Sequence, residues 1–203
     1  VFIDPEEDPE EIVEASDFKD VWAVVKALRD HDAALGETID RLRIDLGRGV
    51  SIIGRRPENI IFDLPSDVTP EFVRAFETRL VEMTSPDFYF GLGVLKQFIQ
   101  REGHARVHTA HREGDFNLGN WISHRRGNYR QGILAPERIE ELEALPGWTW
   151  DPLEADYQEG LAALKIYVER EGHARVPQRY NEGDFNLGGW ISSRRRNYRQ
   201  GIL

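Results

Sequence analysis

The stretch Arg101-Glu-Gly-His-Ala-Arg-Val107 recurs 69 residues later as Arg170-Glu-Gly-His-Ala-Arg-Val176, and this repetition organises the whole chain. Three further motifs, beginning at Glu113, Trp121 and Asn128, recur at the same offset without a gap. Over residues 101–134 and 170–203, 26 of 34 positions are identical. Shared composition does not produce an ungapped match of this length, so the chain contains an internal duplication.

Each copy begins with the apolar spacing of an amphipathic helix. In residues 87–100 and 156–169, large apolar side chains recur at intervals of three and four, which favours a helix. Gly103 and Gly172 follow these segments at the position where a left-handed residue commonly ends a helix. We expect His104 and His173 to bond the last carbonyls of the same helices.

Two further helices are predicted in the first copy. Asp115 or Asn117 can cap a helix that begins near Leu118 and ends at Gly132. Pro136 suits the first turn of a third helix, which ends before Pro146-Gly147. The pattern predicts an all-α fold with tandem three-helix bundles, residues 87–150 and residues 151–203, the second without its third helix.

Residues 1–86 lie outside the duplication. The spacing predicts helices over 18–35, 38–46 and 70–83, with short strands or extended pieces at 1–3 and 60–62. The acidic stretch from Asp4 to Glu14 is expected to be flexible and solvated. We expect this mainly helical segment to be the tail of another domain, without a closed core of its own.

Composition excludes several classes of protein. The 203 residues carry a net charge of −10 and no cysteine, which excludes disulfide frameworks, thiol nucleophiles and Cys-ligated metal sites. No uncharged apolar run is long enough for a membrane span, so we expect a cytoplasmic protein without a membrane partner. Because the chain begins with Val1 rather than Met, we expect it to be a piece of a longer protein.

Charge is distributed in alternating blocks. Residues 1–89 and 135–169 have net charges of −11 and −7, whereas residues 90–134 and 170–203 each have +4. The two basic blocks coincide with the two copies of the repeat. Local charge, rather than the total, decides which partners a surface attracts.

Several motifs in order resemble the helicase-associated domain. They are Glu-Gly-His-Ala-Arg-Val, Leu-Gly-x-Trp-Ile, Arg-Arg-x-x-Tyr-Arg-x-Gly-Ile-Leu, Pro-Glu-Arg-Ile-x-x-Leu and Gly-Trp-x-Trp. This family is a three-helix module found in tandem in the C-terminal region of bacterial superfamily II helicases of the DEAD/DEAH type. The sequence departs from the family pattern at Val107-His108, where Val-Pro is usual, and at Arg125-Arg126, where Gln-Arg is frequent.

The resemblance implies an accessory role in nucleic-acid binding. DNA or RNA and the motor domains of the same chain would be its partners. This fragment contains no phosphate-binding loop, so we expect no catalytic residues and no cofactor in it. ATP and Mg²⁺ are expected only in the core of a parent ATP-dependent helicase, and residues 1–86 resemble the segment that follows its last motif.

Arginines and tyrosines of the basic blocks are the candidate nucleic-acid contacts, because guanidinium groups fit phosphates and aromatic rings stack on bases. On the helical wheel Arg125 points toward the apolar face, so its stem is expected to pack there. The candidate residues are Arg106, Arg112, Arg125, Arg126, Tyr129, Arg130, Arg175, Arg179, Arg194, Arg195, Arg196, Tyr198 and Arg199.

Other interpretations remain open at this stage. The same basic surfaces could dock an acidic protein partner or the acidic first segment of this chain. Trp121, Trp190 and Trp148 could stack on bases, but their apolar faces favour packing inside the repeats. His104, His108 and His111 have a spacing compatible with zinc, yet the second copy replaces two of them, so we expect no metal site.

Overall fold

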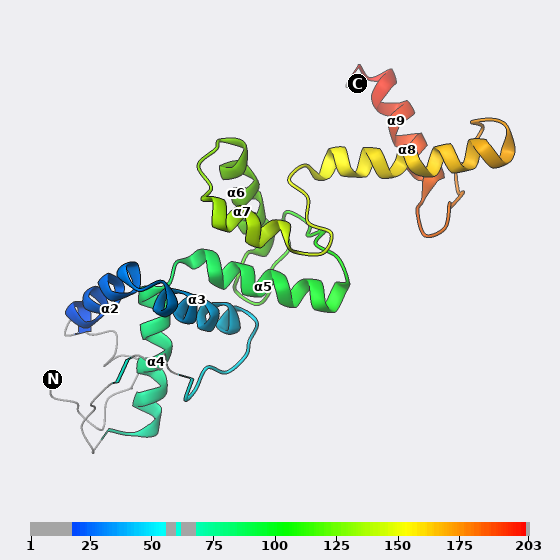
Figure 1. The fold of residues 1–203 in the computed structure, drawn as a ribbon. Helices are drawn as coiled ribbons and strands as arrows, with labels where there is room; N and C mark the ends of the chain where they lie inside the picture. Colours follow the sequence, from blue (N-terminus) through cyan, green and yellow to red (C-terminus); the bar gives the residue numbers. More distant parts are fainter. Residues whose placement is uncertain (1–17, 56–59, 62–67, 202–203) are drawn as a thin grey trace. The chain divides into compact units, whose positions relative to one another are not determined.

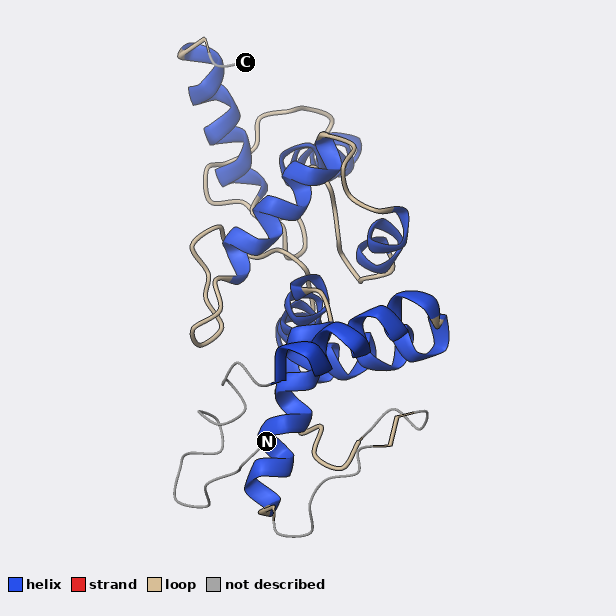
Figure 2. Ribbon diagram, turned by 90° about the vertical axis from the view of Figure 1, so that its left-hand side faces the viewer, coloured by secondary structure: helices blue, strands red, loops and turns tan. Residues whose placement is uncertain are grey.

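The structure, a computed structural model, describes residues 18–55, 60–61 and 68–201 (Figure 1). These residues form eight helices. Figure 2 shows the loops that connect helices in this part of the chain. The prediction of an all-α fold is confirmed for this part of the chain. The chain divides into two compact units, residues 1–148 and 149–203.

Among the described residues, three helices precede the first repeat: α2 (Lys19–His31), α3 (Ala33–Gly47) and α4 (Pro70–Thr84). The prediction of one helix over 18–35 is wrong, because the chain is extended at Asp32, with φ −121° and ψ 103°. The Asp32 carboxylate accepts a hydrogen bond from the Leu35 amide at 3.1 Å and so begins a new helix.

Helices α2, α3 and α4 enclose a hydrophobic cluster. Phe18, Trp22 and Phe76 meet with ring centroids 5.2–5.8 Å apart, and Phe72 is buried beside them. Residues four positions apart in the sequence lie on one face of a helix. Phe18 and Trp22 therefore form one such pair, and Phe72 and Phe76 form another. The described residues between 18 and 81 thus share a hydrophobic cluster, which the sequence analysis did not expect.

Parts of the prediction for this segment fall where the structure gives no description. The predicted strand at 1–3 and the acidic stretch 4–14 lie outside the described residues. Ile60 and Ile61 are irregular rather than a strand, and Phe62 also lies outside the described residues.

The first repeat begins with α5 (Asp87–Glu102), which packs closely against α3. A Cβ atom at Gly47 would lie 2.1 Å from the Phe90 carbonyl oxygen, and one at Gly93 would lie 2.1 Å from the Ile44 carbonyl oxygen. Such distances allow only glycine, so the two backbones touch. The first repeat is thereby held against the helices that precede it.

The remaining helices follow the predicted order. The first repeat continues with α6 (Leu118–Arg130) and α7 (Pro136–Glu143), and the second repeat contains α8 (Pro152–Glu171) and α9 (Leu187–Arg199). Asn117 and its counterpart Asn186 cap α6 and α9 through their side-chain oxygens. Helix α8 begins earlier than predicted because the Asp151 carboxylate accepts from the Leu153 and Glu154 amides.

Along the described chain, no helix combines the length and the apolar character that crossing a membrane requires.

Candidate nucleic-acid interface

In each repeat, a tryptophan of the second helix packs against a glycine of the first helix. Trp121 of α6 lies over Gly91 of α5, where an added Cβ would be 2.2 Å from the indole. Trp190 of α9 lies over Gly160 of α8 in the same way, at 2.0 Å. Both rings are partly buried and pack inside their repeats, as predicted from their apolar faces.

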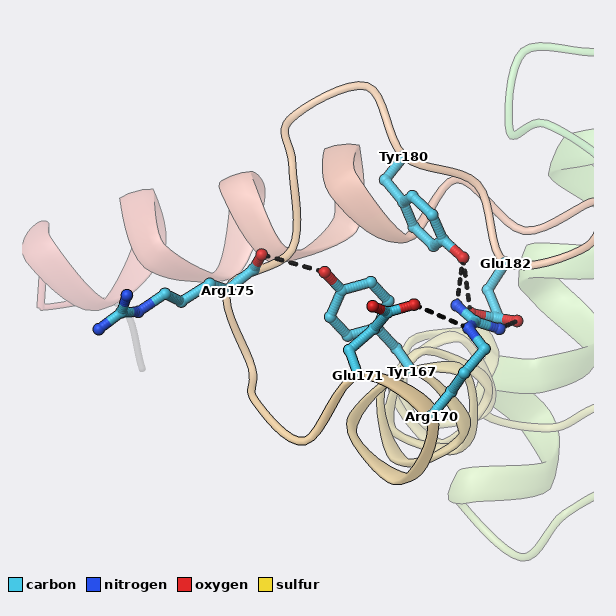
Figure 3. A network of polar contacts seen from close by, with 6 residues as sticks. All are labelled: Tyr167, Arg170, Glu171, Arg175, Tyr180 and Glu182. Carbon is cyan, nitrogen blue, oxygen red and sulfur yellow. Dashed lines mark hydrogen bonds and ion pairs between the residues drawn. The ribbon is translucent and has the colours of Figure 1, made fainter.

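An arginine at the end of the first helix holds the following loop in the second repeat (Figure 3). Arg170 makes a bidentate ion pair with Glu182, at 2.8 and 2.9 Å, and its Nε bonds Glu171 at 2.9 Å. The Tyr180 hydroxyl bonds both Arg170 and Glu182. The loop between the helices is thus tied at its far end to α8, and we call this pair the loop clamp.

The first repeat has the same loop clamp with different support. Arg101 bonds Glu113 at 2.6 and 3.1 Å, and the His111 ring nitrogen lies 2.6 Å from the same carboxylate. The hydrogen bonds from Arg101, and then from His111, lower the pKa of Glu113 from 4.5 to about 2. Arg170 lowers the pKa of Glu182 in the same direction.

The loop clamps remove two arginines from the cationic surface of the repeats. The sequence prediction gave Arg101 and Arg170 no role, although an Arg–Glu pair twelve residues apart in both copies is a usable signal. The two histidines at the helix ends also act differently from the prediction. The Nδ1 atoms of His104 and His173 accept from the amides of Arg106 and Arg175, so they brace the loop instead of bonding the helix carbonyls.

The first arginine of each Arg-Arg pair, Arg125 or Arg194, packs against aromatic rings of its own repeat. The guanidinium carbon of Arg125 lies 5.7 Å from the Trp121 ring centroid, and burial lowers the pKa of this group. Arg194 lies 5.4 Å from the rings of both Tyr157 and Trp190 and 3.6 Å from an Asp156 oxygen. In both repeats it is the guanidinium itself that lies on aromatic rings, so neither arginine points freely to solvent.

The other arginines of the first repeat are partly engaged as well. The Arg126 guanidinium covers Trp148 at 5.1 Å, and Arg112 donates to the Asp115 carbonyl at 2.5 Å. Arg130 is exposed, with its Nε 3.3 Å from the Arg126 carbonyl oxygen, and Arg106 is exposed on the loop. Tyr129, the predicted stacking ring, is 37% exposed.

The second repeat presents a much more open cationic surface. Arg195, Arg196 and Arg199 are exposed on α9, and Tyr198 beside them is 76% exposed. Among the described residues, these three arginines have no ion-pair partner; we call them, with Tyr198, the α9 arginine surface. The loop adds exposed Arg175, whose side chain points away from the loop clamp in Figure 3, and exposed Arg179.

The two repeats correspond to a known family. A family model described as "Helicase associated domain" matches residues 87–151 and 154–203, more than half of the chain. The chain belongs to the helicase-associated domain family. No curated protein and no solved structure matches it significantly.

The family match covers the elements that carry the candidate surface. Helices α5, α6, α7 and α9 lie within the matched segments, as does α8 except for its first two residues, whereas α2, α3 and α4 precede them. The family match therefore indicates an accessory role in a helicase for the two repeats.

Proposed function

We propose that these repeats are accessory nucleic-acid-binding elements of a cytoplasmic, bacterial ATP-dependent helicase. They would hold DNA or RNA through its phosphates while the motor domains of the same chain bind Mg²⁺ and ATP and perform the hydrolysis. The α9 arginine surface is the observation that carries this proposal.

The composition of α9 supports phosphate binding. The helix contains four arginines and no Asp or Glu, and three of the arginines are exposed without a carboxylate partner among the described residues. Guanidinium groups bind phosphate oxygens through a planar fork of donors. An exposed tyrosine in the same surface can stack on an unpaired base of any identity. Binding is therefore expected to depend on the backbone and to show little sequence preference.

The two repeats are expected to contribute unequally. In the first repeat Arg126 lies over Trp148, and Gly127 occupies the position that Arg196 holds in the second. Tyr129 is half as exposed as Tyr198. The second repeat should therefore supply most of the affinity, with Arg130 and Arg106 of the first repeat as secondary contacts.

Fluorescence anisotropy with a labelled single strand and a matched duplex, measured over a range of salt concentrations, tests this proposal. The variant Arg195→Gln/Arg196→Gln/Arg199→Gln should bind all sequences more weakly. If all three arginines contact phosphates, the slope of log affinity against log salt should fall by about 2 to 3 on duplex DNA. The variant Lys19→Gln/Lys26→Gln/Arg41→Gln removes the same charge from exposed positions of α2 and α3 and is the matched control.

Equal weakening by the control would show a general charge effect and contradict a site on α9. Undiminished affinity in the α9 variant would also contradict it, because the proposed contacts would then contribute nothing.

A further inference from the structure

The loop between α8 and α9 has a turn at its tip, in the arch between Arg175 and Tyr180 (Figure 3). The Tyr180 amide donates to the Pro177 carbonyl at 3.2 Å, and such a bond from the fourth residue to the first is typical of a β-turn. Gln178 and Arg179 are its central residues, and both are exposed. Among the described residues, neither side chain has a hydrogen-bond or ion-pair partner, so both are available to a ligand.

The first repeat forms the same turn from different residues. The His111 amide donates to the His108 carbonyl at 2.9 Å, and Thr109 and Ala110 are the exposed central pair. The His108 Nδ1 atom accepts from the Ala110 amide at 3.2 Å, whereas the second repeat has at this position a proline, which fixes its own φ. Because the first repeat contains α5, α6 and α7, the exposure of the turn does not depend on the lack of a third helix.

The backbone of each turn is held against the first residues of the next helix. The Gly188 amide donates to the Tyr180 carbonyl at 2.8 Å, and the Gly119 amide donates to the His111 carbonyl at 3.0 Å. A Cβ atom at either glycine would lie 2.3 Å from a carbonyl oxygen of the turn. The turns are therefore formed before any ligand binds, which lowers the entropic cost of binding.

The turns also lie where the two copies differ most. Of the eight positions that differ between residues 101–134 and 170–203, five are consecutive and include the turn. Neither five-residue segment contains Asp or Glu, although these acids make up 36 of the 203 residues. Arginines present in both copies suit the phosphates that all strands share, whereas a turn that differs suits the bases, which carry the sequence.

We propose that Gln178 and Arg179 bind purine bases of an unpaired strand. This inference rests on the proposed function, in which the α9 arginine surface binds the phosphates. A glutamine side chain matches the donor and acceptor of adenine, and an arginine matches the two acceptors of guanine. These base edges are accessible in a single strand. Gly188, beneath the turn, and Arg196 lie about 12 Å apart along α9, so one strand can reach both places.

Fluorescence anisotropy with short thymine strands of equal length tests this inference. Their central bases are thymine, cytosine, or alternating adenine and guanine. The purine strand should bind about fivefold more tightly than either pyrimidine strand, the lower end for one base contact, so the phosphates still supply most of the affinity. The variant Gln178→Thr/Arg179→Ala has the central pair of the first repeat and should abolish this ratio. Circular dichroism should show an unchanged fold, because both side chains are exposed.

The variant Arg196→Gln is the matched control, because it removes one positive charge from α9 as the turn variant removes one from the loop. It should weaken the binding of all strands alike and keep the ratio at about fivefold. A ratio near one in the unaltered chain, or a ratio that survives in the turn variant, would overturn the inference while phosphate binding stands. Failure of every strand to bind would overturn the proposed function as well.

Discussion

Arginines that occupy identical sequence positions in the two repeats differ in what surrounds them. Arg101 and Arg170 both bind a glutamate of the following loop. Arg126 and Arg195 differ, because the guanidinium of the first lies over Trp148 and the second is exposed. Whether a guanidinium can bind a ligand therefore depends on the side chains that surround it and not on its position in the repeat.

The loop clamp predicts a pH dependence at Glu113. Its pKa is about 2 in the folded chain against an ordinary 4.5, so its contribution to stability is fully present above about pH 4.5. That contribution is lost as the pH falls from 4.5 toward 2, because the unfolded chain takes up the proton first. Glu113→Gln should lower the free energy of unfolding by about 0.5–1 kcal/mol at pH 7, the scale of partly exposed ion pairs.

Urea unfolding of both proteins between pH 7 and pH 2 checks this expectation. The difference between them should shrink across the acidic range. A difference that stays constant with pH would mean that the ionised carboxylate contributes nothing to the clamp.

At the scale of helices, the close contact of α8 and α9 gives a matched pair of glycine substitutions. Gly160→Ala would place a methyl group 2.0 Å from the Trp190 ring and should destabilise the second repeat by about 1–3 kcal/mol. Gly127→Ala in α6 meets no atom within 4 Å and should instead stabilise the first repeat by about 0.5–1 kcal/mol. Thermal unfolding compares the two, and a loss of similar size in both would contradict the contact.

Periodicity predicts most of these helices because their apolar residues recur every three or four positions. It does not predict the break at Asp32, where a capping aspartate interrupts an otherwise helical pattern. It also does not predict the cluster of α2, α3 and α4, because the partners of Phe18 and Trp22 lie some fifty residues further along the chain. Contacts between distant segments carry no local signal.

The candidate site is predictable only in part for the same reason. The sequence identifies every arginine of α9 and places the Arg125 stem on the apolar face. It does not indicate that the Arg126 guanidinium lies over Trp148, because that contact depends on the path of the chain after α7. Nor does it indicate that Arg112 bonds the Asp115 carbonyl, because that contact depends on the conformation of the loop between α5 and α6.

At the scale of the whole chain, we expect the two compact units to respond differently when residues 1–86 are removed. Helix α5 is buried against α6 on one side and touches α3 through Gly47 and Gly93 on another. Removal of residues 1–86 should therefore expose α5 and lower the protection of its amides in hydrogen exchange. The amides of α8 belong to the other unit and should keep their protection; a parallel loss in both helices would contradict this division.

The loop clamp also bears on how such repeats can diverge and be re-engineered. Residues 108–112 and 177–181 differ at five consecutive positions, although the residues on either side, including the clamping Arg and Glu, are identical. A loop whose two ends are fixed by the same pair can change its sequence while the helices on both sides keep theirs. The five residues between Val107 and Glu113, or between Val176 and Glu182, can therefore be exchanged as one segment. New recognition sequences can be grafted at these two places.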